Sequence, residues 1–144
     1  MEVFVREIEE RDYPSALEIW NKEIGSSYFT VENFSSHHDR FKQSENHKAF
    51  VAELGDRIVG IVYIMRCSPW SVDGDYFWIQ GIAVKNDVQG KGIGTKLLEY
   101  IEKYGKDNGV EYITLNTGVK RIDAHAFYEH NGYKSGSYCY GKKL

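Results

Sequence analysis

The chain has 144 residues, 42% of them hydrophobic and 27% charged, which is enough for one domain with a buried core. The net charge of −3 leaves no basic excess to displace phosphate counterions, so no nucleic-acid partner is expected. No apolar stretch is long enough to span a membrane, and the N-terminal segment MEVFVREIEERDY lacks the regions of a signal peptide. Cys67 and Cys139 stand far apart, which favours free thiols and a cytoplasmic protein. We expect a single domain over residues 1–144.

Hydrophobic periodicity predicts an alternation of strands and helices. Asp12 and Thr30 suit the N-caps of the first two helices, and Gly55-Asp56 suits a hairpin turn. In chain order, the patterns predict a strand over 3–8, helices over 12–25 and 30–41, strands over 49–54, 58–65 and 76–84, a helix over 93–108, a strand over 111–117, a helix over 123–130, and one or two short strands within 133–140.

The segment between the third long strand and the following helix is rich in glycine. Gly90, Gly92 and Gly94 occupy every second position, where they let the backbone approach a ligand. The first turn of a helix also has unpaired amides and the positive end of the helix dipole, so this segment suits a pyrophosphate. The order Gly94-Thr95-Lys96 does not fit a P-loop, and no third glycine completes a dinucleotide fingerprint.

Two motifs carry a resemblance to a known family. Gln89-Gly90-Lys91-Gly92-Ile93-Gly94 resembles the (Arg/Gln)-x-x-Gly-x-(Gly/Ala) signature of the GNAT superfamily of acetyl-CoA-dependent N-acetyltransferases. Residues 124–133, AHAFYEHNGY, are similar to the Ala-x-x-Phe-Tyr-x-x-x-Gly-(Phe/Tyr) helix of the same family. The order of elements agrees over nearly the whole chain. The resemblance implies an α/β fold with a mixed, mostly antiparallel central sheet and helices on both faces.

The resemblance also implies roles for individual residues. Tyr128 would protonate the departing CoA thiolate, and a phenol suits that task because its pKa lies near that of a thiol. Backbone amides of the glycine-rich segment would hold the CoA pyrophosphate, and the end of the preceding strand would pair with the pantetheine arm. The residues expected to bind acetyl-CoA are Ile82, Ala83, Val84, Gln89, Gly90, Lys91, Gly92, Ile93, Gly94 and Thr95.

The sequence departs from the family pattern at two positions. Gln80 stands where members often carry a Glu that accepts the proton of the amine, and an amide cannot accept that proton at neutral pH. Arg121 stands where members often carry an Asn that contacts the pantetheine. The alternatives for a general base are Glu53, Asp75, His37 and His38. No group of His, Cys, Asp or Glu has ligand spacing, so no metal is expected.

The acceptor cleft is expected to involve residues 24–29 and 68–78, which are aromatic and acidic. They suit a cationic amine with an apolar body. The candidate acceptor-binding residues are Tyr28, Phe29, Glu53, Asp75 and Gln80. The predicted function is transfer of an acetyl group from acetyl-CoA to a primary amine of a small molecule, by direct attack in a ternary complex. A protein acetyltransferase acting on a lysine or an N-terminus, and a non-catalytic CoA-binding module, are the alternatives, and a homodimer is left open.

Overall fold

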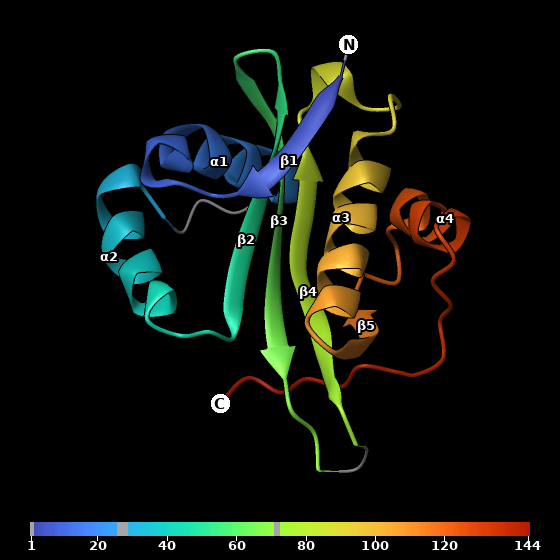
Figure 1. Cartoon of the computed structure of the whole chain (residues 1–144). Coiled ribbons are helices and arrows are strands. Elements are labelled where there is room, and N and C mark those ends of the chain that lie inside the picture. The colour runs from blue at the N-terminus through green and yellow to red at the C-terminus, as the bar shows by residue number, and fades with distance from the viewer. Residues whose placement is uncertain (1, 26–28, 71–72) are drawn as a thin grey trace. The chain divides into compact units, whose positions relative to one another are not determined.

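A computed structural model describes residues 2–25, 29–70 and 73–144, and the chain divides into two compact units, residues 1–114 and 115–144. Figure 1 labels the strands and α-helices of the described residues. Their bounds are β1 Val3–Glu7, α1 Tyr13–Ile19, α2 Val31–Lys42, β2 His47–Leu54, β3 Arg57–Cys67, β4 Asp75–Val84, α3 Ile93–Asp107, β5 Val110–Leu115 and α4 Ile122–His130.

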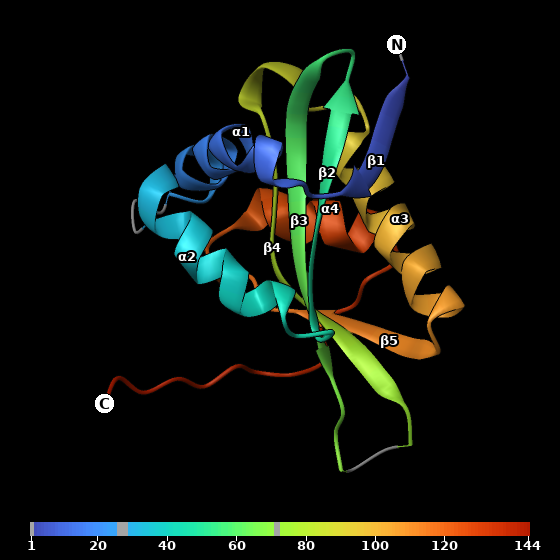
Figure 2. The same ribbon diagram turned by 60° about the vertical axis from the view of Figure 1, so that its left-hand side comes forward.

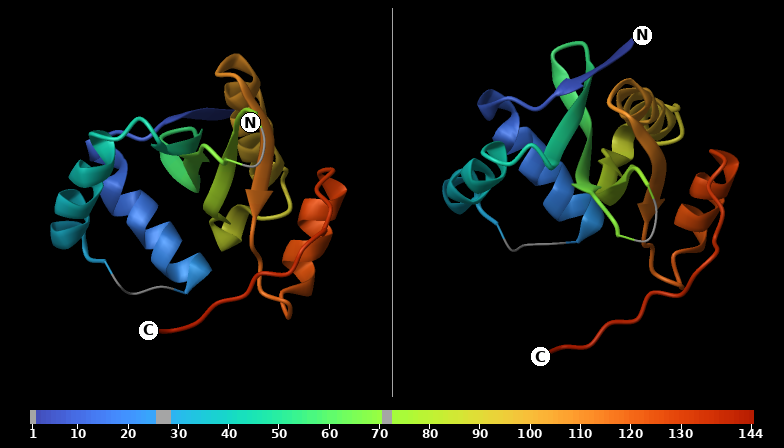
Figure 3. Two further views of the ribbon diagram at one scale, coloured as in Figure 1. Left: turned by 90° about the horizontal axis from the view of Figure 1, so that it is seen from below. Right: turned by 60° about the horizontal axis from the view of Figure 1, so that its bottom comes forward.

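The strands form one sheet in the order β1-β2-β3-β4-β5. The first four pair antiparallel, and the register runs across the sheet from Val51 to Ile61 to Ala83. The long crossover through α3 lets β5 run in the same direction as β4, as Figure 3 shows. The sheet is therefore mixed and mostly antiparallel, which confirms the predicted fold class.

Successive strand residues face opposite sides of the sheet and pack into two separate layers of the core. Val51 and Ile61 pack with the α1 residues Ala16 and Ile19 on one face. The neighbouring residue Phe50 faces the other way, with its ring centroid 5.0 Å from that of Tyr100 on α3. Helices therefore cover both faces of the sheet, α1 and α2 on one side and α3 on the other (Figure 3).

Two glycines allow a helix to approach the sheet closely. A Cβ on Gly60 of β3 would lie 3.1 Å from Leu97 and 3.3 Å from Ile93, so the start of α3 rests directly on this strand. A Cβ on Gly81 of β4 would clash with the Trp20 ring on the opposite face. Gly60 pairs with Val84, so both contacts lie beside the end of β4, where the glycine-rich segment begins.

The first predicted helix is not uniform. The α-helical part ends at Ile19, and Trp20–Ile24 form a π-helical stretch that stops at Gly25 in the left-handed conformation, φ 84°. A π-turn is often found at functional sites, and here it brings Trp20 over Gly81. The periodic pattern predicted a helix in the right place, but not this change of helical hydrogen bonding.

The two predicted N-caps have different outcomes. Thr30 caps α2 reciprocally with Asn33: the Thr30 N–H donates to Asn33 Oδ1 at 2.7 Å, and the Asn33 N–H donates to Thr30 Oγ1 at 3.4 Å. Asp12 lies at the N-cap position of α1, but its carboxylate makes no cap bond. It accepts hydrogen bonds from the Arg6 guanidinium at 2.7 and 2.9 Å, because a charged partner binds a buried carboxylate more strongly than an amide.

The second unit contains the end of β5, α4 and the C-terminal residues. The predicted short strands within 133–140 are wrong, since residues 133–144 have no regular secondary structure. Tyr138 and Tyr140 are 88% and 90% exposed. Alternating residues mark the two faces of a strand, but a strand forms only where a neighbour accepts its backbone hydrogen bonds. The expectation of one domain stays a prediction.

Candidate functional site

The connection from β4 to α3 presents bare backbone to its surroundings. After β4, a 3₁₀ turn at Asn86–Val88 leads to Gly90 and Gly92, whose φ angles are 79° and 81°. Residues that carry a side chain rarely adopt this left-handed backbone conformation. A Cβ built at either glycine would meet nothing within 4 Å, so the space in front of the loop is open. A ligand could therefore lie directly against the main chain here.

The start of α3 provides hydrogen-bond donors to that space. Gly92 is the N-cap residue and no side chain caps it; the Lys96 N–H donates to the Gly92 carbonyl at 3.1 Å and begins the helical ladder. The amides of Ile93, Gly94 and Thr95 therefore have no acceptor within the helix. They stand at the positive end of a 15-residue helix. This arrangement suits an anion such as a pyrophosphate.

Side chains hold the loop from the α1 side of the sheet. Gln89 Nε2 donates to the Val84 carbonyl at 2.8 Å and to Glu23 Oε2 at 3.4 Å. The Asn86 N–H donates to Glu23 Oε1 at 3.2 Å. Gln89, predicted to contribute its backbone, thus also shapes the loop through its side chain. Glu23 was not predicted, because its partners lie more than sixty residues away and no local pattern marks it.

The loop also has charged neighbours. Lys91 lies between the two left-handed glycines and Lys96 lies in the first turns of α3, and both are exposed. Arg57 reaches Asp87 at 3.0 Å, and this hydrogen bond lowers the pKa of the Asp87 carboxyl. The two lysines add exposed positive charge beside the loop.

The predicted pantetheine strand is the last part of β4. Ile82, Ala83 and Val84 pair with β3 in regular register. Just before them the register shifts: Gly81 pairs with Tyr63, whereas Ile79 pairs with Ile64. Gln80 is the unmatched residue of this bulge, and it is exposed. Bulges of this kind redirect side chains and are common beside active sites.

Two of the predicted acceptor and base residues, Glu53 and Asp75, lie at opposite ends of the sheet. Glu53 pairs with Ile58 at the β2–β3 hairpin, whereas Asp75 begins β4 at the opposite end. On β3, the partner of Glu53 is Ile58 and the partner of Tyr76 is Cys67, nine residue steps away, or roughly 30 Å. Glu53 accepts a hydrogen bond from Arg6 at 2.9 Å, and Arg6 lowers the pKa of its carboxyl. Glu53 and Asp75 therefore do not share one site.

Asp75 has its own partners at its end of the sheet. Arg66 Nε donates to one carboxylate oxygen at 2.5 Å, and Ser68 Oγ donates to the other at 2.8 Å. These hydrogen bonds, that of Arg66 above all, lower the pKa of the Asp75 carboxyl. A carboxylate held in this way is a weak proton acceptor.

The aromatic candidates lie at the start of α2. Phe29 has its ring centroid 4.4 Å from that of His37, and burial lowers the pKa of the His37 imidazole. His38 is buried against Tyr13 and Phe34, and burial lowers its pKa too. These histidines pack with aromatic rings. Tyr28 lies outside the described residues.

In the second unit, Tyr128 is a half-buried residue of α4. Its ring contacts those of Phe127 and Tyr133, at centroid distances of 5.2 and 6.1 Å. Burial raises the pKa of the Tyr128 phenol, and the charge of Arg121 opposes this effect only in part. The phenol is therefore protonated at neutral pH, as a proton donor must be.

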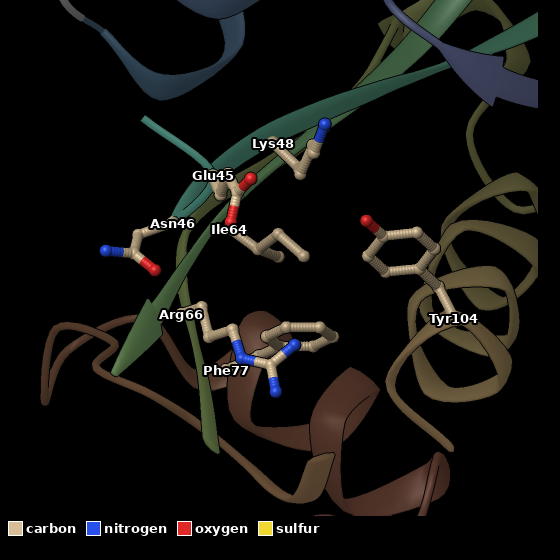
Figure 4. Close-up of a pocket in the computed structure, with 7 residues that line it drawn as sticks. All are labelled: Glu45, Asn46, Lys48, Ile64, Arg66, Phe77 and Tyr104. Carbon is tan, nitrogen blue, oxygen red and sulfur yellow. The ribbon is translucent and has the colours of Figure 1, made fainter. Parts of the chain in front are cut away.

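The close-up in Figure 4 shows a small cavity between the sheet and α3. Its volume is about 20 Å³, enough for a single water molecule and too small for an amine or a cofactor. The residues that line it are Glu45, Asn46, Lys48, Ile64, Arg66, Phe77 and Tyr104. Within the described part of the chain, no group of three His, Cys, Asp or Glu could hold a metal ion, and no helix is long and apolar enough to cross a membrane.

Comparisons with known proteins identify the family of the chain. The model of the acetyltransferase (GNAT) family matches residues 4–133. An aminoalkylphosphonate N-acetyltransferase of Salmonella typhimurium is 38% identical over 66 residues, which cover 46% of this chain and 43% of that protein. The chain matches about half the length of this and other curated relatives.

Solved structures show the same fold. A transcriptional regulator from Bacillus halodurans C-125 superposes with a TM-score of 0.90 at 23% identity, covering 99% of this chain and 100% of that one. An aminoglycoside acetyltransferase from an uncultured soil sample has a TM-score of 0.86 at 20% identity, with 99% and 96% covered. At these identities the likeness is one of fold, whereas the family model spans most of the sequence and both motifs. The chain belongs to the GNAT family of acetyltransferases.

Proposed function

We propose that the chain binds acetyl-CoA at the β4–α3 loop and transfers its acetyl group to a primary amine of a small molecule. The carrying observation is the loop itself: two left-handed glycines with open space before them, followed by the uncapped start of a long helix. This surface recognises a pyrophosphate by backbone amides and requires no metal ion. We place the activity in the cytoplasm and in a single domain, as the sequence predicts.

The proposed reaction is a direct attack of the amine on the thioester. The nitrogen forms a bond to the acetyl carbon, the carbon–sulfur bond breaks, and the thiolate takes a proton from Tyr128. Burial keeps the Tyr128 phenol protonated, which supports this role. Alignment of the two substrates contributes several kcal/mol to lowering the barrier, and a general acid adds about 10²–10⁴-fold in rate.

The choice of a small amine rests on two observations. Two tryptophans lie near the bulge of β4. Trp20 lies against Gly81, and Trp78 of β4 pairs with Met65 of β3. The Salmonella relative is named for an aminoalkylphosphonate, and the metagenomic structure is an aminoglycoside acetyltransferase. Both names describe small amines, so we favour this class over a protein lysine or N-terminus.

The first experiment tests the cofactor. Calorimetric titration should show acetyl-CoA binding in the micromolar range, about −8 kcal/mol, with no comparable binding of ATP or NAD. Gly92→Val should weaken acetyl-CoA binding about 100-fold, since a side chain would occupy the space before the loop. Gly109→Val is the matched control, because Gly109 also has a positive φ, 74°, and open surroundings, but lies beyond the far end of α3.

Equal losses of affinity in the two glycine variants would contradict the proposed cofactor site. The second experiment follows the release of free thiol from acetyl-CoA with a panel of amines and, separately, with lysine-containing peptides. Release with small amines supports the proposed acceptor. Release with peptides alone would favour a protein acetyltransferase, and binding without release would favour a CoA-binding module.

A further inference from the structure

The face of the sheet that α1 covers carries a polar pair close to the bulge. Tyr63 of β3 pairs with Gly81, the residue next to the unmatched Gln80. Trp20 covers Gly81 and meets the Tyr63 ring edge to face, with the centroids 6.4 Å apart. Figure 2 shows β2, β3 and β4 together with α1, which contacts β3. Tyr63 is half-buried, so its ring belongs partly to the core and partly to this surface.

Tyr63 is hydrogen bonded to a histidine of the neighbouring strand. Its Oη lies 2.5 Å from His47 Nδ1, and the two rings are nearly parallel, with centroids 5.9 Å apart. Burial raises the pKa of the Tyr63 phenol to about 12. The phenol therefore stays protonated at neutral pH, and a proton that reaches its oxygen must be passed on. His47 is placed to receive it, because its Nδ1 lies at hydrogen-bond distance from the phenol oxygen and histidine is a common proton acceptor in catalysis.

The carboxylates predicted as bases are already engaged. Glu53 is ion-paired with Arg6 and Asp75 with Arg66, at opposite ends of the sheet, and the amide of Gln80 takes no proton. The elements packed over this face bring further titratable and charged groups. Glu23 accepts a hydrogen bond from the backbone of the glycine loop. On α2, the charges of His37, Asp39 and Lys42 act on His38.

We propose that Tyr63 and His47 form the relay that removes the proton from the acceptor amine. This inference rests on the proposed acetyltransfer. The ammonium group gives a proton to Tyr63 Oη, directly or through one water, while the Tyr63 O–H passes its own proton to His47 Nδ1. The amine becomes neutral and can attack, Tyr63 is unchanged, and His47 becomes an imidazolium that later releases the proton to water. Over the whole reaction the amine loses two protons: the relay sends the first to solvent, and the second, lost as the carbon–sulfur bond breaks, replaces the proton that Tyr128 gives to the thiolate.

The test compares wild type with Tyr63→Phe and His47→Asn on one amine that gives thiol release. Phenylalanine keeps the ring but removes the hydroxyl, and asparagine keeps an acceptor but cannot hold the proton. At pH 7 both variants should lose about 10²-fold in kcat/KM, within the range of general base catalysis. At about pH 10 the kcat/KM of both variants should come close to that of wild type, since much of the amine is then already unprotonated. Tyr112→Phe, at an exposed position of β5, is the matched control.

The outcomes separate the relay from the proposed function. A loss that is the same at pH 7 and pH 10, or no loss at all, would overturn the relay while leaving acetyltransfer intact. Absence of thiol release by wild type with every amine would instead remove the proposed function. Acetyl-CoA affinity should be unchanged in both variants, and unfolding curves will show whether each variant folds. If Tyr63→Phe is unstable, the pH dependence of His47→Asn decides alone.

Discussion

At the level of single residues, the proposed roles divide between backbone and side chains. Gly90 and Gly92 leave the backbone of the loop uncovered, and their positive φ angles exclude most other residues. Tyr128 and Tyr63 are both phenols whose pKa burial raises, so both carry a proton at neutral pH. We give them opposite tasks, donation to the thiolate and relay from the amine. The relay task is given to Tyr63 because its hydroxyl is hydrogen bonded to His47.

The role of Tyr128 is tested by Tyr128→Phe. If the phenol donates a proton in the transition state, kcat should fall by about 10²–10⁴ with little change in the KM for acetyl-CoA. Tyr133→Phe is the matched control, since this neighbouring ring also belongs to the second unit. Rates and pH profiles are measured on one working amine. Equal kcat values for wild type and Tyr128→Phe would show that the ring only packs.

At the level of elements, the loop is held by the stretch that follows α1. The π-helical turn places Trp20 over Gly81 and sends Glu23 to the loop, where the carboxylate accepts from Asn86 and Gln89. On the other face, Gly60 allows α3 to rest on β3. The amides at the start of α3 are therefore positioned by contacts on both faces of the sheet. Preorganised donors bind an anion without a further ordering cost.

This bracing predicts the effect of Glu23→Ala. The loss of two hydrogen bonds should weaken acetyl-CoA binding about tenfold, because each contributes roughly 0.5–1.5 kcal/mol. Hydrogen exchange at the amides of residues 86–92 should become faster. Glu18→Ala, at an exposed position on α1, is the control and should change neither quantity. Unchanged exchange in Glu23→Ala would mean that the loop keeps its shape without the carboxylate.

At the level of the molecule, ion pairs tie the first strand to the rest of the first unit. Arg6 of β1 binds Asp12 at the start of α1 and Glu53 of β2, and the Asp12 side chain also accepts the Glu9 N–H at 2.8 Å. Asp12 is only 4% exposed. Burial alone would raise the pKa of its carboxyl, but the hydrogen bonds from Arg6 and Glu9 outweigh it and the pKa is lowered.

The lowered pKa fixes the sign of the pH dependence. A carboxyl whose pKa is lower in the folded state stabilises the fold above its unfolded pKa, and this contribution disappears as pH falls below about 4. At pH 7, Asp12→Asn should lower the free energy of unfolding by about 3 kcal/mol, because Arg6 loses a buried partner. The difference from wild type should shrink in acid. Urea unfolding at pH 7 and pH 3 measures it, and a constant difference would contradict the role of the ion pair.

Much of the fold could be read from local patterns. The apolar runs of β2 and β3, the apolar stripe of α3 and the Thr30 cap depend on residues a few positions apart. The glycine loop was predicted for the same reason, since φ preference and an open helix start belong to one short segment. The tail at 133–140 shows the limit of alternation, because a strand also needs a neighbour that no local pattern supplies.

The sequence by itself thus determined the family, the order of the helices and long strands, and the open glycine loop before α3. Only the tertiary structure decided which side chains meet: Glu23 with the loop, Arg6 with Glu53, and Tyr63 with His47. Glu53 reads as a candidate base in the sequence, and its ion pair becomes visible only when β1 lies beside β2. The physical reason is that secondary structure follows from neighbours along the chain, whereas proton affinity depends on partners brought together from distant positions.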